Sequence, residues 1–342
     1  MASATIAYRH IAGSHCESTA MRNWLAHLGI ELSEELCLGI GCGLGFTYFR
    51  MPGMPHFLVM GRGDDLEFHL ADNLGLILEM HKPGGRDPWI PVKELLDAGE
   101  PVLVDVDVRH LEYIRRSDSW PEGVGFGGHK MMLVGYDEEA GVAYAHDYAW
   151  WDRLTIPLAD LAAARLAAGG VTEPEGKWYT LSRPRGLEPD LPRAVRSALA
   201  GTVHRLLHPW DKFHGLPAIR GLMEELPLWP RLLGEERART SARLAYIMFD
   251  VAGTGRGCFR RIYGRFLLEA APLVDEPELE ALGRHYLQLA KLWSQLSAML
   301  REAGEGRPCP VFEGKAGSLL AEIARGETEG ASRLEEVVSG WI

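Results

Sequence analysis

The first strong periodic pattern of apolar positions lies close to the start of the chain. Helical spacing links four apolar residues, and a residue typical of a helix stop follows them: Met21, Trp24, Leu25, Leu28 and then Gly29. This pattern predicts a helix over roughly residues 16–28. Its first turn would hold Cys16, behind the turn-like pair Gly13-Ser14.

Further along, short apolar runs indicate strands. The segments expected as single strands are HFLVMG (56–61), PVLVDVDV (101–108) and KWYTLSR (177–183). The segment GGHKMMLVGYDEEAGVAYAHD (127–147) holds two apolar runs around a turn with Asp and Gly, which is typical of a β-hairpin. A helix is expected over VKELLDAG (92–99), and a strand followed by a helix in RLTIPLADLAAARLA.

A segment rich in proline and charge, RPRGLEPDLPRA (183–194), follows these strands and reads as a domain boundary. Beyond it the strand signals vanish and helical periodicity continues to the end. The pattern therefore predicts an α+β protein, with an N-terminal catalytic domain over 1–183 and a helical C-terminal domain over 195–342.

Composition narrows the class of protein. The 342 residues are 46% hydrophobic with a formal net charge of -11 and no basic run, which argues against a nucleic-acid partner. No apolar stretch is long enough for a membrane span, and the N-terminus lacks the apolar core of a signal peptide. Five cysteines without paired or CxxC spacing favour neither a disulfide framework nor zinc. We therefore expect a cytoplasmic protein with no membrane contact and no metal.

Three residues form a candidate catalytic constellation. His129 opens one strand of the expected hairpin and Asp147 ends the next, so an antiparallel pairing makes them neighbours. A carboxylate beside an imidazole orients the ring and stabilises its charged form. Cys16 begins a helix, whose N-terminal dipole favours a thiolate. The order Cys, His, Asp is that of papain-like cysteine enzymes.

Other residues could compete for these roles. Asp137 lies in the turn and is expected to form it, Asp152 is expected to be a cap or surface charge, and His15 is expected to be structural or to face the substrate. The remaining cysteines are expected to pack in the interior: Cys37, Cys42, Cys258 and Cys309. Among them Cys258 is the strongest competitor, because it also follows a glycine-rich turn.

Two glycine-rich segments leave alternatives open. GIGCGLGF (39–46) could cradle a phosphate, but a tight turn is the simpler interpretation. GTGRGC (253–258) precedes a helix with Arg260, Arg261 and Arg265, which could hold a phosphate or an acidic carrier protein. The simpler interpretation is a turn between helices with a solvated basic face.

The motifs HCESTAMRNWLAHLG and GGHKMMLVGYDEEAGVAYAHD resemble the N-terminal domain of the butirosin biosynthesis protein H family. That domain is similar to bacteriocin-leader peptidases of the papain-like group. The helical half, with GTGRGCFRRIYGRFLLEA and LAKLWSQL, resembles the uncharacterised domain that usually accompanies it. The resemblance implies a papain-like N-terminal fold and covers nearly the whole chain.

The resemblance also implies an activity. The family's named member transfers an aminoacyl group from the phosphopantetheine thioester of an acyl carrier protein to an amine of an aminoglycoside. Carried over by motif, Cys16 is the nucleophile, His129 the base and Asp147 the orienting acid. In the related peptidases a glutamine six positions before the cysteine helps to form the oxyanion hole. That position is His10 here, and a neutral imidazole N–H can also donate to an oxyanion.

The expected function is thus a cysteine-dependent acyltransferase of antibiotic or other secondary metabolism. Its partners would be an acyl carrier protein, whose phosphopantetheine carries the donor, and a small-molecule amine acceptor; the chain itself would need no cofactor. Two alternatives remain at this point. A cysteine hydrolase, either an amidase or a peptidase, could use the same triad, or a degenerate domain of this type could bind a carrier protein or metabolite without catalysis.

Overall fold

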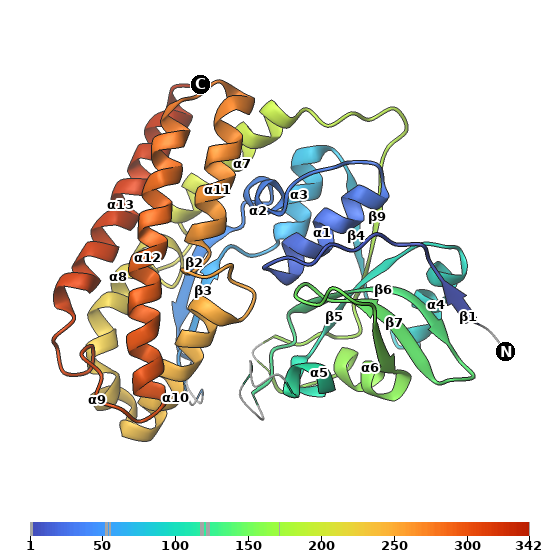
Figure 1. Ribbon diagram of the computed structural model, residues 1–342, viewed down its shortest axis with the longest axis horizontal. Helices are drawn as coiled ribbons and strands as arrows, with labels where there is room; N and C mark the ends of the chain where they lie inside the picture. Colours follow the sequence, from blue (N-terminus) through green and yellow to red (C-terminus); the bar gives the residue numbers. More distant parts are fainter. Residues whose placement is uncertain are drawn as a thin grey trace. The chain divides into compact units, whose positions relative to one another are not determined.

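The computed structural model describes residues 3–51, 54, 56–116, 120, 124–170 and 172–341 (Figure 1). The chain divides into two compact units. Unit 1 consists of residues 1–37 and 75–188, and unit 2 consists of residues 38–74 and 189–342.

The strands, with their bounds, are β1 (Ser3–Thr5), β2 (Leu44–Phe49), β3 (Leu58–Arg62), β4 (Ile77–His81), β5 (Val102–Val106), β6 (His129–Asp137), β7 (Val142–His146), β8 (Leu154–Pro157) and β9 (Trp178–Ser182). The α-helices of the first half are α1 (Cys16–His27), α2 (Glu34–Ile40), α3 (Leu66–Leu74), α4 (Trp89–Asp97), α5 (Glu112–Arg115) and α6 (Leu158–Arg165). Those of the second half are α7 (Leu191–Leu207), α8 (Gly215–Glu225), α9 (Trp229–Leu233), α10 (Glu235–Tyr246), α11 (Arg260–Val274), α12 (Glu278–Gly304) and α13 (Gly317–Ser339). Short helices of other types are η1 (Val108–His110), η2 (Leu226–Leu228) and η3 (Ile247–Val251).

Unit 1 is built on an antiparallel sheet with the strand order β4-β9-β5-β6-β7-β8, and β1 pairs with the free part of β6. Helix α1 packs against β6, while α4 and α6 contribute to a core on strands β5 and β6 (Figure 1). Because side chains alternate along a strand, β6 can serve both faces of the sheet. Met131 and Leu133 enter the core, whereas Met132 lines a small cavity together with Cys16.

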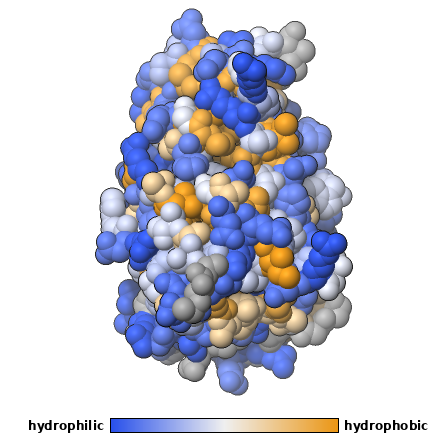
Figure 2. All heavy atoms as spheres, turned by 90° about the vertical axis from the view of Figure 1, so that its right-hand side faces the viewer, coloured by the Kyte–Doolittle hydropathy of each residue, from blue (hydrophilic) through white to orange (hydrophobic). Residues whose placement is uncertain are grey.

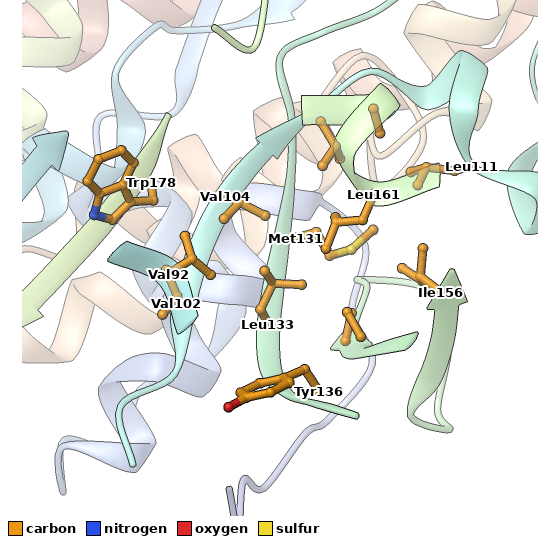
Figure 3. Close-up of a cluster of buried hydrophobic side chains, with 14 of the residues drawn as sticks. Val92, Val102, Val104, Leu111, Met131, Leu133, Tyr136, Ile156, Leu161 and Trp178 are labelled. Carbon is orange, nitrogen blue, oxygen red and sulfur yellow. The ribbon is translucent and has the colours of Figure 1, made fainter. Parts of the chain in front are cut away.

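The core of unit 1 is closed by side chains from several elements (Figure 3). Val104 from β5 and Leu133 from β6 are fully buried, as is Val92 from α4. Leu161 from α6 covers the same cluster. Truncating a buried leucine of this kind to alanine costs about 2–5 kcal/mol. The sheet that carries the candidate residues is therefore held rigidly.

Unit 2 combines the helices of the second half with the β2–β3 ribbon. Helices α11, α12 and α13 lie side by side (Figure 1). A two-stranded ribbon alone is marginally stable in water, so it depends on packing against other elements. Tyr48 of β2 donates to Glu225 at 2.8 Å and accepts from the indole N–H of Trp229 at 3.0 Å. Buried Arg260 donates to the carbonyl oxygens of Gly45 and Gly61, one on each strand.

These observations differ from the contiguous domain expected over residues 1–183. Residues 38–74 belong to unit 2, because β2, β3 and α3 find their packing partners among the helices of the second half. The chain finally passes from unit 1 to unit 2 between Glu188 and Pro189, inside the segment expected as a boundary. No local pattern in residues 38–74 indicates which half of the chain they join.

The coarse class is confirmed as mixed α and β, with an antiparallel sheet and a helical C-terminal region. The helix expected over 16–28, the strand over 101–108 and the hairpin over 127–147 are all present. Strand β2 was not expected, because its residues overlap the glycine-rich segment interpreted as a turn. Strand β4 was also missed, since its exposed residues lack clean alternation.

The surface shown in Figure 2 is mostly hydrophilic, with apolar side chains in small separate patches. Across the described part of the chain, no helix combines the length and apolar character that a membrane span requires.

Candidate active site

Cys16 is the first residue of α1, and its side chain is buried, with 7% of the residue exposed. His15 precedes it in an extended conformation and caps the helix, because its Nδ1 accepts a hydrogen bond from the backbone N–H of Ser18. This cap explains why the helix starts at the cysteine. The thiol therefore lies at the positive end of the helix dipole, as the sequence indicated.

A buried carboxylate that the sequence analysis missed holds the chain in front of Cys16. Oε1 of Glu34 accepts hydrogen bonds at 2.9 Å from the backbone N–H groups of Ser14 and His15. The same oxygen accepts from the hydroxyls of Ser18 at 3.1 Å and Thr19 at 2.9 Å. One side chain thus joins the loop before the cysteine to the first turn of α1.

Gly13 closes this arrangement. A Cβ atom at Gly13 would lie 2.2 Å from the hydroxyl of Thr19 and 2.4 Å from a carboxylate oxygen of Glu34, so only glycine fits. The backbone N–H of Gly13 donates to the carbonyl oxygen of Tyr148 at 2.6 Å. The loop before Cys16 is thereby tied to the segment that follows β7.

The expected pair His129 and Asp147 is present. His129 begins β6, Asp147 follows β7, and the antiparallel pairing of these strands brings the two side chains together. Nε2 of His129 donates to Oδ2 of Asp147 at 2.9 Å. Asp147 also accepts from the hydroxyl of Tyr113 and from the backbone N–H of Tyr148, each at 2.7 Å. A carboxylate with three donors holds the imidazole in one orientation.

Cys16 also lies near His129, and the imidazole acts on the ionisation of the thiol. Nε2 of the ring is engaged with Asp147, which leaves Nδ1 for the thiol. Burial raises the pKa of Cys16, but the electrostatic influence of His15 and His129 outweighs burial and lowers this pKa to about 6. The thiol is therefore mostly ionised at neutral pH.

His129 shifts in the opposite direction. Burial disfavours its charged form, yet the charge and hydrogen bond of Asp147 raise its pKa well above the usual range, with help from Cys16. A thiolate beside an imidazolium, oriented by a carboxylate, is the state that cysteine acyl chemistry needs. All three residues are nearly inaccessible to solvent, which strengthens the interactions among them.

His10 differs from its expected role. It lines the same small cavity as Cys16, but both of its ring nitrogens have partners. Nε2 donates to the carbonyl oxygen of Trp150 at 2.9 Å, and Nδ1 accepts from the side-chain amide of Asn23 at 3.0 Å. In this arrangement the ring has no hydrogen left for an oxyanion at Cys16. A single sequence could not reveal these two partners.

The rival residues take the roles expected of them. Oδ1 of Asp137 accepts from two backbone N–H groups of the hairpin turn, so this carboxylate forms the turn. Burial raises the pKa of Cys258 to about 12, although the neighbouring Arg260 opposes the shift. Burial also raises the pKa of Cys42 and of Cys309. None of these three thiols resembles Cys16 in its environment.

The basic helix after the second glycine-rich segment is not simply a solvated face. Arg260 is fully buried and pairs with Glu327, with 2.7 Å between Nε and Oε1. Its guanidinium is thus committed to the interior of unit 2 and cannot hold a phosphate. In the part of the chain that the structure describes, no group of three or more His, Cys, Asp or Glu side chains is arranged to hold a metal ion.

Two family models match the chain. The model for butirosin biosynthesis protein H, N-terminal, matches residues 15–148, which include Cys16, His129 and Asp147. The model for a domain of unknown function, DUF4872, matches residues 159–334, more than half of the chain. The chain belongs to the DUF4872 family and carries the butirosin biosynthesis protein H N-terminal domain before it. No curated protein matches the chain.

Proposed function

We propose that this protein is a cysteine-dependent acyltransferase with a papain-like catalytic unit. It would move an acyl or aminoacyl group from a carrier-protein thioester to an amine acceptor, through an acyl-enzyme on Cys16. The family of the N-terminal domain takes its name from butirosin biosynthesis, which favours an enzyme of antibiotic biosynthesis. The phosphopantetheine would belong to the carrier protein, and a cytoplasmic location fits such a partner.

One observation carries the proposal. Cys16, His129 and Asp147 come from distant parts of the chain, and His129 is hydrogen-bonded to Asp147 and lowers the pKa of Cys16. The buried thiol has a pKa of about 6, below its usual range, despite a desolvation that opposes ionisation. Lowered thiol pKa values of this kind occur at nucleophilic sites rather than at packing positions.

The chemistry follows from these groups. The Cys16 thiolate adds to the carbonyl carbon of the donor thioester, and collapse of the adduct breaks the bond to the carrier sulfur. The imidazolium of His129 gives its proton to that leaving thiolate and becomes neutral. One thioester replaces another, so this exchange is close to thermoneutral.

In the second half the amine attacks the acyl-enzyme. Neutral His129 takes a proton from the amine as the new C–N bond forms, and the C–S bond to Cys16 then breaks. The products are an amide, the thiolate and the imidazolium, so the enzyme returns to its first state. Asp147 stabilises the charged ring at each stage.

Both steps create an oxyanion. The backbone N–H of Cys16 suits this charge, because it lies in the first turn of α1, where amides have no acceptor within the helix. His10, with its present partners, suits the role poorly. A contribution from the backbone does not depend on which residue stands six positions before the cysteine.

The same groups could instead hydrolyse the acyl-enzyme if water were the acceptor. A panel of aminoacyl-pantetheine thioesters, each incubated with and without a diamine, separates these outcomes. We expect an adduct mapped to Cys16 by mass spectrometry and an amide that forms when the amine is present. Free acid at the same rate with and without amine would favour a hydrolase. No adduct with any donor would favour a binding domain.

A further inference from the structure

Unit 2 contains a cavity of about 410 Å³ that the proposed catalysis does not use. It is lined by residues of β2, β3, α3 and α7 and by the segment before α8. Its volume lies in the range of sites for small organic ligands. Part of the glycine-rich segment 39–46 contributes to its wall, so this motif belongs to a pocket in unit 2.

Two arginines line this cavity, Arg62 and Arg205. Arg62 donates to the carbonyl oxygen of Gly63 at 3.1 Å. Nη1 of Arg205 donates to Nε2 of His69 at 2.5 Å, and its Nη2 donates to the carbonyl oxygen of Cys42 at 3.1 Å. Both partners are neutral, since burial and the charge of Arg205 lower the pKa of His69. Among the described residues, no carboxylate lies within ion-pair distance of Arg205. The guanidinium therefore keeps a positive charge that no acidic side chain balances.

Two acidic side chains line the same cavity. Asp64 and Asp65 join β3 to α3, and both are exposed. Within the described ranges, neither carboxylate has a cationic partner at ion-pair distance. The cavity thus presents two carboxylates beside the guanidinium groups of Arg62 and Arg205, and Arg205 has no carboxylate partner among the described residues.

An aromatic surface completes the site. Trp210 is 69% exposed and packs on His214, with 4.0 Å between the ring centroids. A flat indole on the rim of a cavity suits contact with an apolar or aromatic group. Phe46 adds a buried apolar wall.

The glycines of the cavity explain its shape. A Cβ atom at Gly45 would lie 2.6 Å from the backbone nitrogen of Gly63, so these two glycines let β2 and β3 approach closely. Gly215 has a φ of +61° and lies against the carbonyl oxygen of Leu206. The glycine-rich motif therefore builds the wall through backbone packing and does not need to cradle a phosphate.

We infer that this cavity binds a small zwitterion, of the class of an α-amino acid with an apolar side chain. Its carboxylate would pair with Arg205, its ammonium group with Asp64 or Asp65, and its side chain would pack on Trp210. A ligand with several negative charges fits less well, because Asp64 and Asp65 would repel it. The inference concerns unit 2 alone and does not depend on Cys16 chemistry.

Three matched probes test the assignment on the full chain: L-phenylalanine, 3-phenylpropanoate, which lacks the amine, and 2-phenylethylamine, which lacks the carboxylate. Ligand-observed NMR titration gives a Kd for each probe. We expect phenylalanine to bind about fivefold or more tightly than either analogue. No saturable binding at millimolar concentration, or equal binding of all three, would overturn the inference. So would binding of inorganic phosphate in preference to phenylalanine, which indicates a simple anion site.

Variants locate the site. Arg205→Gln should remove the difference in Kd between phenylalanine and 2-phenylethylamine, which lacks the carboxylate. The double variant Asp64→Asn/Asp65→Asn should remove the difference in Kd between phenylalanine and 3-phenylpropanoate, which lacks the amine. Both aspartates are exposed, so the second variant tests the inference even if the first does not fold. Asp72→Asn is the matched control, because Asp72 is an exposed residue of α3 outside the cavity lining. Cys16→Ala should leave all three affinities unchanged, which separates this site from the proposed catalytic one.

Discussion

Cys16 in unit 1 and Cys258 in unit 2 look alike along the chain, since each comes within three residues of a preceding glycine and lies just before or at the start of a helix. Both are buried, and both have a cationic side chain as a neighbour. Their pKa values nevertheless differ, at about 6 for Cys16 and about 12 for Cys258. Sequence context alone therefore does not create a reactive thiol.

The two pKa values differ because the side chains beside the two thiols differ. Arg260 beside Cys258 is paired with Glu327, and that carboxylate opposes ionisation of the thiol. Arg260 does reach the sulfur of Cys258, at 3.7 Å. Cys16, however, has two imidazoles as neighbours, His15 and His129, and both lower its pKa. At Cys258 one arginine does not outweigh desolvation and the charge of Glu327, whereas the two imidazoles at Cys16 do outweigh desolvation.

The largest expected effect comes from removing each thiol in turn. Cys16→Ala should abolish the acyl adduct and lower kcat by about 10⁴-fold or more, because no other group can form the intermediate. Cys258→Ala should retain the adduct and most of the activity. Intact-protein mass spectrometry after brief exposure to donor, with peptide mapping, measures both. An adduct that still forms in Cys16→Ala would show that a residue other than Cys16 is acylated.

The next effect tests the source of the low pKa. In His129→Ala the favourable influence of the imidazole on the thiolate is lost while desolvation remains, so the pKa of Cys16 should rise above 6. Alkylation by iodoacetamide as a function of pH reports the thiolate, whose fraction grows as pH rises through the pKa. The wild-type half-point should lie near pH 6. Transfer activity should fall by about 10²–10⁴-fold; an unchanged alkylation profile would exclude His129 as the cause.

A smaller effect is expected at Glu34. Glu34→Gln replaces one acceptor oxygen with an N–H donor that faces the hydroxyl and amide donors around it. The loop before Cys16 should lose its fixed position, with acylation slower by about tenfold. Glu31→Gln is the control, since Glu31 is exposed and forms a surface ion pair with Arg9. Equal rates in both variants would assign Glu34 no part in placing the thiol.

The smallest effect concerns the carboxylate behind the imidazole. Tyr113→Phe removes one of the three hydrogen bonds to Asp147 and leaves the packing intact. Because two donors remain, transfer should slow only about two- to fivefold. The upper half-point of the pH–rate profile should fall slightly, since a less restrained Asp147 stabilises the imidazolium less. A loss as large as that of His129→Ala would mean that Tyr113 does more than orient Asp147.

How much of this site could be predicted from the sequence depends on how far apart along the chain the residues of each contact lie. The pairing of His129 with Asp147 is a hairpin property, and the local pattern of apolar runs around a turn was enough to predict it. The place of Cys16 on α1 also follows from local periodicity. The contact between Cys16 and His129 needed the order of residues in a known enzyme group, because no local signal joins them.

Other features could not be predicted from local patterns. Glu34 acts on a loop some twenty positions earlier, and nothing in its own segment distinguishes it from a surface glutamate. The two hydrogen-bond partners of the His10 ring lie at positions 23 and 150. Only the folded structure therefore shows that both ring nitrogens are already engaged. The membership of residues 38–74 in unit 2 likewise depends on helices that follow residue 189.

The interleaved order of the two units has a consequence for synthesis on the ribosome. Residues 38–74 leave the ribosome early, yet the helices that shelter β2 and β3 are translated after residue 189. At rates of about 5–20 residues per second, the ribbon waits on the order of ten seconds or more for its partners. Unit 1 has all of its residues by position 188, so it can fold first with the ribbon looped out. During that interval β2 and β3 are the part of the nascent chain that most needs protection by a chaperone.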